Sequence, residues 1–343
     1  GFMDSQVFIL NEKRNVTLTA YLQDDSQEFW RAKKRPAVVI FPGGAYAYCS
    51  DREADPVAQE YLRAGYHAFV LRYSVGWENA VWPNPLEDYD QAMELIAAHA
   101  KEWHLIPEKI AVIGFSAGGH LAACAATMAK HRPAAAILAY PVILEGLAAI
   151  CAKGAPGADK AVDSQTCPCF IAAAGTDTTV SAMNSLRFVE ALYENGISAE
   201  LHLYAFGPHG FSTARTSIAD PAELCSRTLH WVEDSISWLE DVFGAFTSGE
   251  MSRPRCPGRV RKDKDPYLSV DCLLATIAGN QIAVERLNQL ILVEETTQKW
   301  IAEQKENLLT SEMTLRSALQ FLNVPGEVIR KADEILSEIP NRK

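Results

Sequence analysis

The chain has 343 residues, 48% hydrophobic and 22% charged, with a formal net charge of −11. This excess of negative charge argues against a nucleic-acid partner, and no apolar run reaches the roughly 18 residues that a membrane span needs. The first thirty residues lack the apolar core of a signal peptide, so we expect a cytoplasmic protein. We expect the eight cysteines of such a chain to be reduced thiols.

Runs typical of strands alternate with runs of helical spacing over most of the chain. Two short strands are expected before residue 23, and "PAVVIF" (36–41) is typical of a strand buried on both faces. Further strands are predicted at 66–73, 109–114, 134–140, 169–175 and 199–206. Helices are predicted at 88–103, 117–130, 182–196 and about 221–245. This alternation predicts an α/β fold, with a mostly parallel sheet, helices on both faces, and chemistry at the carboxyl ends of the strands.

A different composition begins after residue 246. Residues 247–266 are rich in proline, glycine and charge and are predicted to link a domain over 1–246 to a helical C-terminal region over 267–343. The six cations of the linker are interpreted as solvated, with binding to an anionic surface as the alternative.

The C-terminal region carries a stripe of apolar residues. Ile277, Val284 and Ile291 are seven residues apart, Leu287 is placed on the same face, and a last helix is expected to start near Pro325. Helices this short are marginal alone in water, so this region should pack on the domain or on a second copy of the chain, as a homo-oligomer would.

One pentapeptide carries the strongest chemical signal. In "IAVIGFSAGGHLA" (110–122), Ser116 stands between Gly114 and Gly118, after a strand-like run and before a helical one. This is the pattern of a nucleophile elbow, in which the two glycines let the chain turn sharply and expose the serine hydroxyl. The alternative is a tight structural turn. A catalytic serine also needs a base, an orienting acid and donors for the oxyanion.

The two partners are expected later in the chain, each just after a strand. Asp177 follows the predicted strand "CFIAAAG", and His209 follows the predicted strand "AELHLYAF". Alone, Asp177 could be a turn or capping residue, and His209 an exposed loop histidine. Because both occur in the order that the elbow requires, we predict a Ser116–His209–Asp177 triad. The N–H of Ala117 and the glycine-containing loop after "VVIF" are candidates for the oxyanion hole.

Five segments, "FPGGAY", "PLEDYDQA", "GFSAGGHLA", "GTDTTV" and "GPHGF", resemble the α/β-hydrolase fold over roughly residues 30–245. The similarity is to the esterase branch, which includes acetyl xylan esterases, related carbohydrate esterases and lipase-like proteins. It implies that Ser116 is the nucleophile, His209 the base and Asp177 the acid. It further implies an oxyanion hole made by the backbone N–H groups of Gly44, Ala45 and Ala117.

Three details qualify the resemblance. Related esterases often have His-Gly-Gly-Gly where this chain has Pro42-Gly43-Gly44-Ala45, and the methyl group of Ala45 narrows the approach to the hole. The segment 141–168 is short and rich in alanine and glycine, which argues against a bulky lipid-binding cap. Asp88, in "PLEDYDQA", is interpreted as a structural helix cap.

The sequence therefore predicts a serine carboxylesterase that cleaves short acyl esters, most simply acetyl esters of carbohydrates, and needs neither metal nor cofactor. Its partner would be a small-molecule ester, without a nucleic acid or membrane. The alternatives are a serine peptidase of the same fold and a catalytically silent fold that binds through its tail. Four aromatic residues on loops near the site are candidates for substrate binding, with core packing as the alternative: Tyr46, Tyr48, Trp77 and Trp82.

Overall fold

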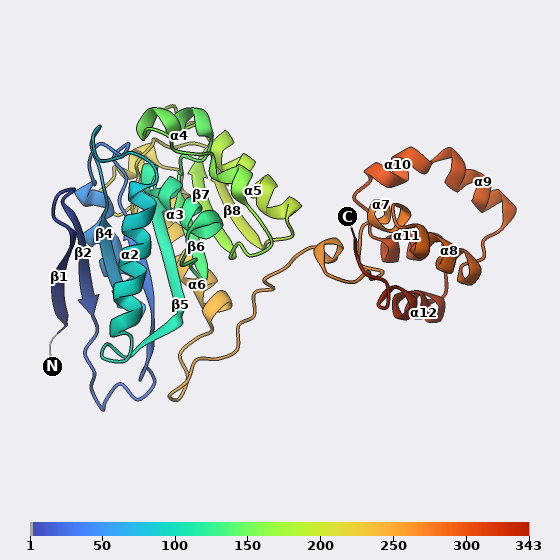
Figure 1. Ribbon diagram of the computed structural model, residues 1–343, viewed down its shortest axis with the longest axis horizontal. Helices are drawn as coiled ribbons and strands as arrows, with labels where there is room; N and C mark the ends of the chain where they lie inside the picture. The colour runs from blue at the N-terminus through green and yellow to red at the C-terminus, as the bar shows by residue number, and fades with distance from the viewer. Residues whose placement is uncertain (1–2, 343) are drawn as a thin grey trace. The chain divides into compact units, whose positions relative to one another are not determined.

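The computed structural model describes residues 3–342 and divides between residues 258 and 259 into two compact units. The N-terminal unit contains an eight-stranded sheet with the strand order β1-β2-β4-β3-β5-β6-β7-β8 (Figure 1). The strands are β1 (Asp4–Asn11), β2 (Val16–Leu22), β3 (Arg35–Phe41), β4 (His67–Arg72), β5 (Leu105–Phe115), β6 (Ala135–Ala139), β7 (Cys169–Ala174) and β8 (Ala199–Tyr204). β2 pairs antiparallel with β1 and β4, and the pairs from β4 to β8 are parallel.

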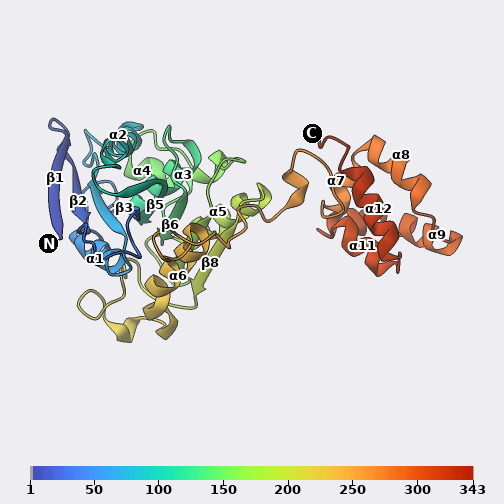
Figure 2. The same cartoon turned by 90° about the horizontal axis from the view of Figure 1, so that it is seen from below.

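Helices cover both faces of this sheet, so the expected α/β fold is confirmed. α2 and α3 lie on one side, and α1 and α6 lie on the other (Figure 2). The helices are α1 (Asp55–Arg63), α2 (Asn84–His99), α3 (Ala117–Met128), α4 (Glu145–Cys151), α5 (Met183–Glu194) and α6 (Trp231–Phe243). Of these, α1 and α4 had not been predicted from the sequence.

The central strand β3 shows why its sequence is uniformly apolar. Val39 and Phe41 pack into the core beneath α2, α3 and α5, whereas Val38 and Ile40 pack into the core beneath α1 and α6. Because successive side chains of a strand point to opposite faces, a strand covered on both sides must be apolar at every position. The two cores fix the sheet and place the carboxyl ends of its parallel strands at one edge.

The segment predicted as a linker is divided between the two units. In the N-terminal unit, Ser252 exchanges hydrogen bonds with Ala245, and Arg255 pairs with Asp241 of α6. The ring of Phe246 packs against Tyr66, 6.2 Å between centroids. The first part of this segment therefore packs on the sheet domain.

Over residues 259–342, the C-terminal unit has its own apolar core and six short helices. They are α7 (Leu274–Ala278), α8 (Gln281–Leu290), α9 (Glu295–Glu303), α10 (Lys305–Thr310), α11 (Leu315–Phe321) and α12 (Gly326–Leu336). The predicted stripe from Ile277 to Ile291 does not lie on one helix, because Asn280 separates α7 from α8 and its side chain accepts a hydrogen bond from the backbone N–H of Ala283. Asparagine is a strong N-cap residue, and it starts a new helix here. The last helix does begin after Pro325, as expected.

None of the helices in residues 3–342 has both the length and the apolar character to cross a bilayer.

Candidate active site

Ser116 lies on a sharp turn between β5 and α3, with φ of 56° and ψ of −116°. A Cβ built on Gly114 would lie 2.1 Å from the carbonyl oxygen of Gly118, and one built on Gly118 would lie 2.1 Å from that of Phe41. Any side chain at either position would push the helix away from the sheet. A non-glycine residue in this backbone conformation costs on the order of 1–3 kcal/mol, so the surrounding packing must hold the turn.

The structure brings the three predicted residues together at the carboxyl edge of the sheet. Ser116 Oγ lies 2.9 Å from His209 Nε2, and His209 Nδ1 lies 2.7 Å from Asp177 Oδ2. Ser116 follows β5, Asp177 follows β7 and His209 follows β8. In the neutral imidazole, Nδ1–H donates to the carboxylate and Nε2 accepts from the serine hydroxyl. This orientation leaves Nε2 ready to take the hydroxyl proton.

The Asp177 carboxylate is held by its own backbone turn. Its Oδ1 accepts from the N–H groups of Thr179 and Val180, both at 2.9 Å, while its Oδ2 accepts from His209. Burial acts to raise the pKa of Asp177, but the hydrogen bonds from His209 and the two backbone N–H groups outweigh it and lower the pKa below its ordinary value. The carboxylate therefore remains ionised beside the histidine and cannot easily change its orientation.

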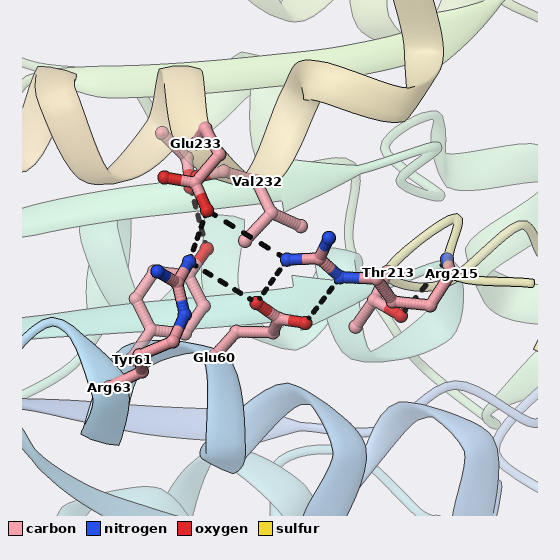
Figure 3. A network of polar contacts seen from close by, with 8 residues as sticks. Glu60, Tyr61, Arg63, Thr213, Arg215, Val232 and Glu233 are labelled. Atoms are coloured by element: carbon pink, nitrogen blue, oxygen red, sulfur yellow. Dashed lines mark hydrogen bonds and ion pairs between the residues drawn. The ribbon is translucent and has the colours of Figure 1, made fainter. Parts of the chain in front are cut away.

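The loop that carries His209 is tied down at two places beyond the histidine. Ser212 Oγ donates to the carbonyl oxygen of Arg52 at 2.6 Å, and Trp231 Nε1 donates to the carbonyl oxygen of Ser212 at 2.9 Å. Farther along the loop, Arg215 donates to both carboxylate oxygens of Glu60 on α1, at 2.7 and 2.8 Å (Figure 3).

The ion pair between Arg215 and Glu60 is part of a wider network. Arg63 of α1 pairs with Glu233 of α6, and Arg215 lies 3.8 Å from the same Glu233 carboxylate (Figure 3). Arg63, Arg215 and Glu233 are about half exposed, although Glu60 is only 12% exposed, so solvent screens the pairs and each contributes about 1 kcal/mol to stability. Their effect is to join the histidine loop to the two helices on one face of the sheet.

The loop after β3 presents backbone donors near the serine. Gly44 and Ala45 have φ of 132° and 55°, and a Cβ on Gly44 would lie 2.2 Å from the carbonyl oxygen of Tyr48. Across residues 3–342, no protein acceptor takes a hydrogen bond from the N–H groups of Gly44, Ala45 or Ala117. Free backbone donors of this kind suit a negatively charged oxygen.

The four candidate aromatic residues separate into two groups. Tyr48 and Trp77 are exposed over 61% and 82% of their surfaces. Tyr46 is only 1% exposed, and its hydroxyl lies 2.8 Å from Nδ1 of the buried His120. Trp82 packs against the same imidazole, with 5.4 Å between centroids. Tyr46 was predicted to border the substrate, but its ring is enclosed by the core. Trp82 helps to enclose His120.

Sequence reasoning misplaced one carboxylate and missed another. Asp88 lies inside α2 and does not cap it: its side chain accepts from the N–H and the hydroxyl of Ser74 and from Arg14. Glu53 is 4% exposed and accepts a hydrogen bond from the N–H of Gly43, in the loop that carries the free donors. No motif marks Glu53 in the sequence, since it stands in a polar run on a short turn.

Parts of the chain are similar to known proteins. Residues 28–142 match the family described as BD-FAE. The chain is 31% identical over 229 residues to endo-1,4-beta-xylanase B of Butyrivibrio fibrisolvens, covering 57% of this chain and 35% of that protein. It is 30% identical over 197 residues to the acetylxylan esterase of Xylanibacter ruminicola, covering 51% of this chain and 41% of that protein. The chain thus spans less than half the length of these two curated relatives.

A solved structure matches much more completely. The crystal structure of MGS-M1, an α/β-hydrolase enzyme from a Medee basin deep-sea metagenome library, superposes with a TM-score of 0.65 at 42% sequence identity. The match covers 70% of this chain and 98% of that chain. At this identity and coverage, the match shows that the chain belongs to the α/β-hydrolase family.

Proposed function

We propose that the protein is a serine carboxylesterase that hydrolyses short acyl esters, most simply acetyl esters of carbohydrates. The observation that carries the proposal is the continuous chain of contacts from Ser116 Oγ through the imidazole of His209 to Asp177. A serine hydroxyl is a poor nucleophile at neutral pH unless a base takes its proton, and this arrangement supplies the base and its orienting acid.

In the proposed reaction, Ser116 Oγ attacks the carbonyl carbon of the ester while His209 Nε2 takes the hydroxyl proton. Asp177 keeps the proton on Nδ1 and stabilises the imidazolium that forms. The imidazolium then gives its proton to the leaving alcohol, and an acyl group remains on Ser116. A water molecule, deprotonated by His209 in the same way, attacks the acyl-enzyme and releases the acid.

Each tetrahedral intermediate places a negative charge on the former carbonyl oxygen. The free N–H groups of Gly44, Ala45 and Ala117 are the proposed donors to it. They belong to a loop and a helix N-terminus that are already in place, so little reorganisation is needed as the charge develops. Loss of one such donor typically lowers turnover by about 10²- to 10³-fold.

Two observations favour a carbohydrate ester. The relative from Xylanibacter ruminicola is named an acetylxylan esterase, and the one from Butyrivibrio fibrisolvens is named a xylanase. Tyr48 and Trp77 leave their aromatic faces exposed, and such faces suit sugar rings. Acetylated pentose and hexose sugars are therefore the proposed substrates.

A panel of acetylated sugars, aryl acetates and lipid esters tests the proposal, with wild-type protein and Ser116→Ala side by side. We expect acetyl esters to be cleaved and the substitution to lower turnover by on the order of 10⁴-fold, because only binding and oxyanion stabilisation would remain. If Ser116→Ala kept a tenth of the wild-type rate, the assignment of the nucleophile would be wrong.

A further inference from the structure

Glu53 is a buried carboxylate that contacts the oxyanion loop directly and is connected to the histidine loop through Tyr140. It ends a short turn, Asp51–Glu53, that follows the loop carrying the free N–H donors. Its Oε1 accepts from the N–H of Gly43 at 3.0 Å, and its Oε2 accepts from the hydroxyl of Tyr140. Burying a charge is costly unless hydrogen bonds compensate it. The burial of the Glu53 carboxylate therefore indicates a role beyond packing.

On one side, Glu53 fixes the backbone that leads into the oxyanion loop. Tyr73 donates its hydroxyl to the carbonyl oxygen of Pro42, and Ser50 donates its N–H to that of Gly43 at 2.8 Å. The Gly43 N–H donates to Glu53, so this N–H and the carbonyl oxygens of Pro42 and Gly43 all have hydrogen-bond partners. The N–H of Gly44 is therefore the first free donor along this loop. A Cβ on Gly43 would lie 2.7 Å from Glu53 Oε1 and 3.2 Å from Ser116 Cβ, so carboxylate, loop and nucleophile are packed together.

On the other side, Glu53 reaches the histidine loop through Tyr140. The Tyr140 hydroxyl accepts from the N–H of Ser212 at 3.0 Å, so its own hydrogen is directed to Glu53. The Tyr140 ring packs edge-on against the His209 imidazole, 4.8 Å between centroids. Tyr140 therefore holds His209 by ring packing and holds the backbone three residues later by a hydrogen bond.

We propose that Glu53 is a positioning residue for the proposed esterase reaction: through Gly43 on one side and Tyr140 on the other, it sets the spacing between the oxyanion donors and the base. The inference rests on the proposed function. Reacting groups must be held to within a fraction of an ångström, and a displacement of about 1 Å can cost on the order of 10²-fold in rate.

The contacts require a carboxylate and are not met by an amide of the same shape. Both oxygens of Glu53 accept hydrogen bonds, and the Tyr140 hydroxyl cannot turn its hydrogen elsewhere while it accepts from Ser212. In Glu53→Gln, an NH2 group replaces one of the two acceptor oxygens, so it faces either the Tyr140 hydroxyl hydrogen or the Gly43 N–H, and one hydrogen loses its acceptor. Burial raises the pKa of Glu53, and the hydrogen bonds from Tyr140 and Gly43 oppose that rise.

The test compares Glu53→Gln, Tyr140→Phe and the double variant in the full chain. Tyr140→Phe retains the aromatic ring that packs against His209 and the charge of Glu53, and it removes only the hydroxyl that connects Glu53 to Ser212. This variant therefore tests the proposal even if Glu53→Gln fails to fold. With an aryl acetate, each single variant should lower kcat about 10- to 100-fold with little change in KM. The double variant should lower kcat by less than the product of the two single effects, because both substitutions break the hydrogen bond between Tyr140 and Glu53.

A second readout is the rate at which a fluorophosphonate labels Ser116, which needs the nucleophile, the base and the oxyanion donors. Asp88→Asn is the matched control, since it removes another buried, hydrogen-bonded carboxylate of the same unit and should lower stability while leaving kcat and labelling per folded molecule near wild type.

The outcomes separate the two proposals. Wild-type turnover that survives Ser116→Ala would contradict the esterase assignment, whatever Glu53 does. If both single variants label Ser116 within twofold of the wild-type rate, the positioning role is overturned while the esterase assignment stands. If the wild-type protein does not label at all, both fail. Slower labelling in Glu53→Gln and Tyr140→Phe, but not in Asp88→Asn, supports the positioning role.

Discussion

Asp177→Asn should disable the enzyme without disturbing its fold, because of how the carboxylate is held. Asp177 Oδ1 accepts from the N–H groups of Thr179 and Val180, so an asparagine would keep its carbonyl oxygen there. Its amide nitrogen would then occupy the place of Oδ2 and point its hydrogens at His209 Nδ1. The imidazole could only respond by moving its proton to Nε2.

That tautomer cannot act as a base toward Ser116, because the proton on Nε2 now points at Ser116 Oγ. We expect kcat/KM to fall by on the order of 10⁴-fold, which is the effect of losing the correct tautomer in known serine hydrolases. Each factor of ten corresponds to about 1.36 kcal/mol, so the loss of transition-state stabilisation is about 5 kcal/mol. The free energy of unfolding should change far less, since the side-chain volume and both backbone contacts are retained.

The assay is hydrolysis of an aryl acetate by wild-type protein and Asp177→Asn, with urea unfolding of both. Thr179→Ala is the control, because its backbone N–H and the geometry of the turn are unchanged, and it should hydrolyse within a few-fold of wild type. The reasoning is refuted if Asp177→Asn keeps more than a tenth of wild-type kcat/KM. A variant that is inactive because it is unfolded would show that the carboxylate supports the turn more than the tautomer.

Three further predictions address the acyl group, acid stability and the C-terminal unit. Acetyl esters should be cleaved faster than octanoyl esters, because the short segment 141–168 offers little apolar wall and each buried methylene gains only about 0.8 kcal/mol; a steady rise in kcat/KM from two to eight carbons would contradict this. Burial lowers the pKa of His120 from 6.5 to about 4. Between these two pH values the imidazole is protonated in the unfolded chain but neutral in the folded one, so the free energy of unfolding decreases as the pH falls, by about 2 kcal/mol between pH 7 and pH 5. In urea unfolding, the free energy of unfolding of His120→Gln should decrease less over this pH range than that of the wild type. The same pH dependence in both proteins would show that His120 is not the group responsible. A chain ending at Gly258 should keep its kcat, because every proposed catalytic group precedes that residue. We propose that the C-terminal unit, which exposes Leu292 and Phe321, joins copies of the chain. Sedimentation should then show the full chain as an oligomer and the shortened chain as a monomer.

The sequence predicted well what local physical chemistry determines. The glycines around Ser116 mark a turn that only small residues allow, and the uniformly apolar run at β3 marks a strand covered on both faces. Asp177 and His209 could be located because each follows a strand of a parallel sheet, and such strands end at the same edge. The structure gives the contacts between these residues, which spacing alone could only suggest.

Interactions between distant segments could not be predicted in this way. Glu53 and Tyr140 are 87 residues apart, and neither belongs to a recognisable pattern. The loop aromatic residues look alike in sequence, yet Tyr46 is enclosed while Trp77 is exposed, because only the first meets a buried imidazole. In the C-terminal unit, the apolar period suggested one helix, but the capping side chain of Asn280 divides it. Local hydrogen bonding prevailed there over the hydrophobic pattern.

The backbone conformation of the site loops leads to a related conclusion. Among residues 3–342, ten residues other than glycine have positive φ, and six of them lie in the oxyanion loop, at the elbow, after β6 or in the histidine loop: Ala45, Tyr46, Ser116, Tyr140, Ser212 and Ala214. Each such residue costs on the order of 1–3 kcal/mol and persists only where its surroundings hold it. The hydrogen bonds of Tyr140 and Ser212 hold two of these residues, and both lead to Glu53 or to its neighbour Arg52. The buried carboxylate therefore stands where two strained loops meet, which is why a single amide substitution is expected to affect both the base and the oxyanion donors.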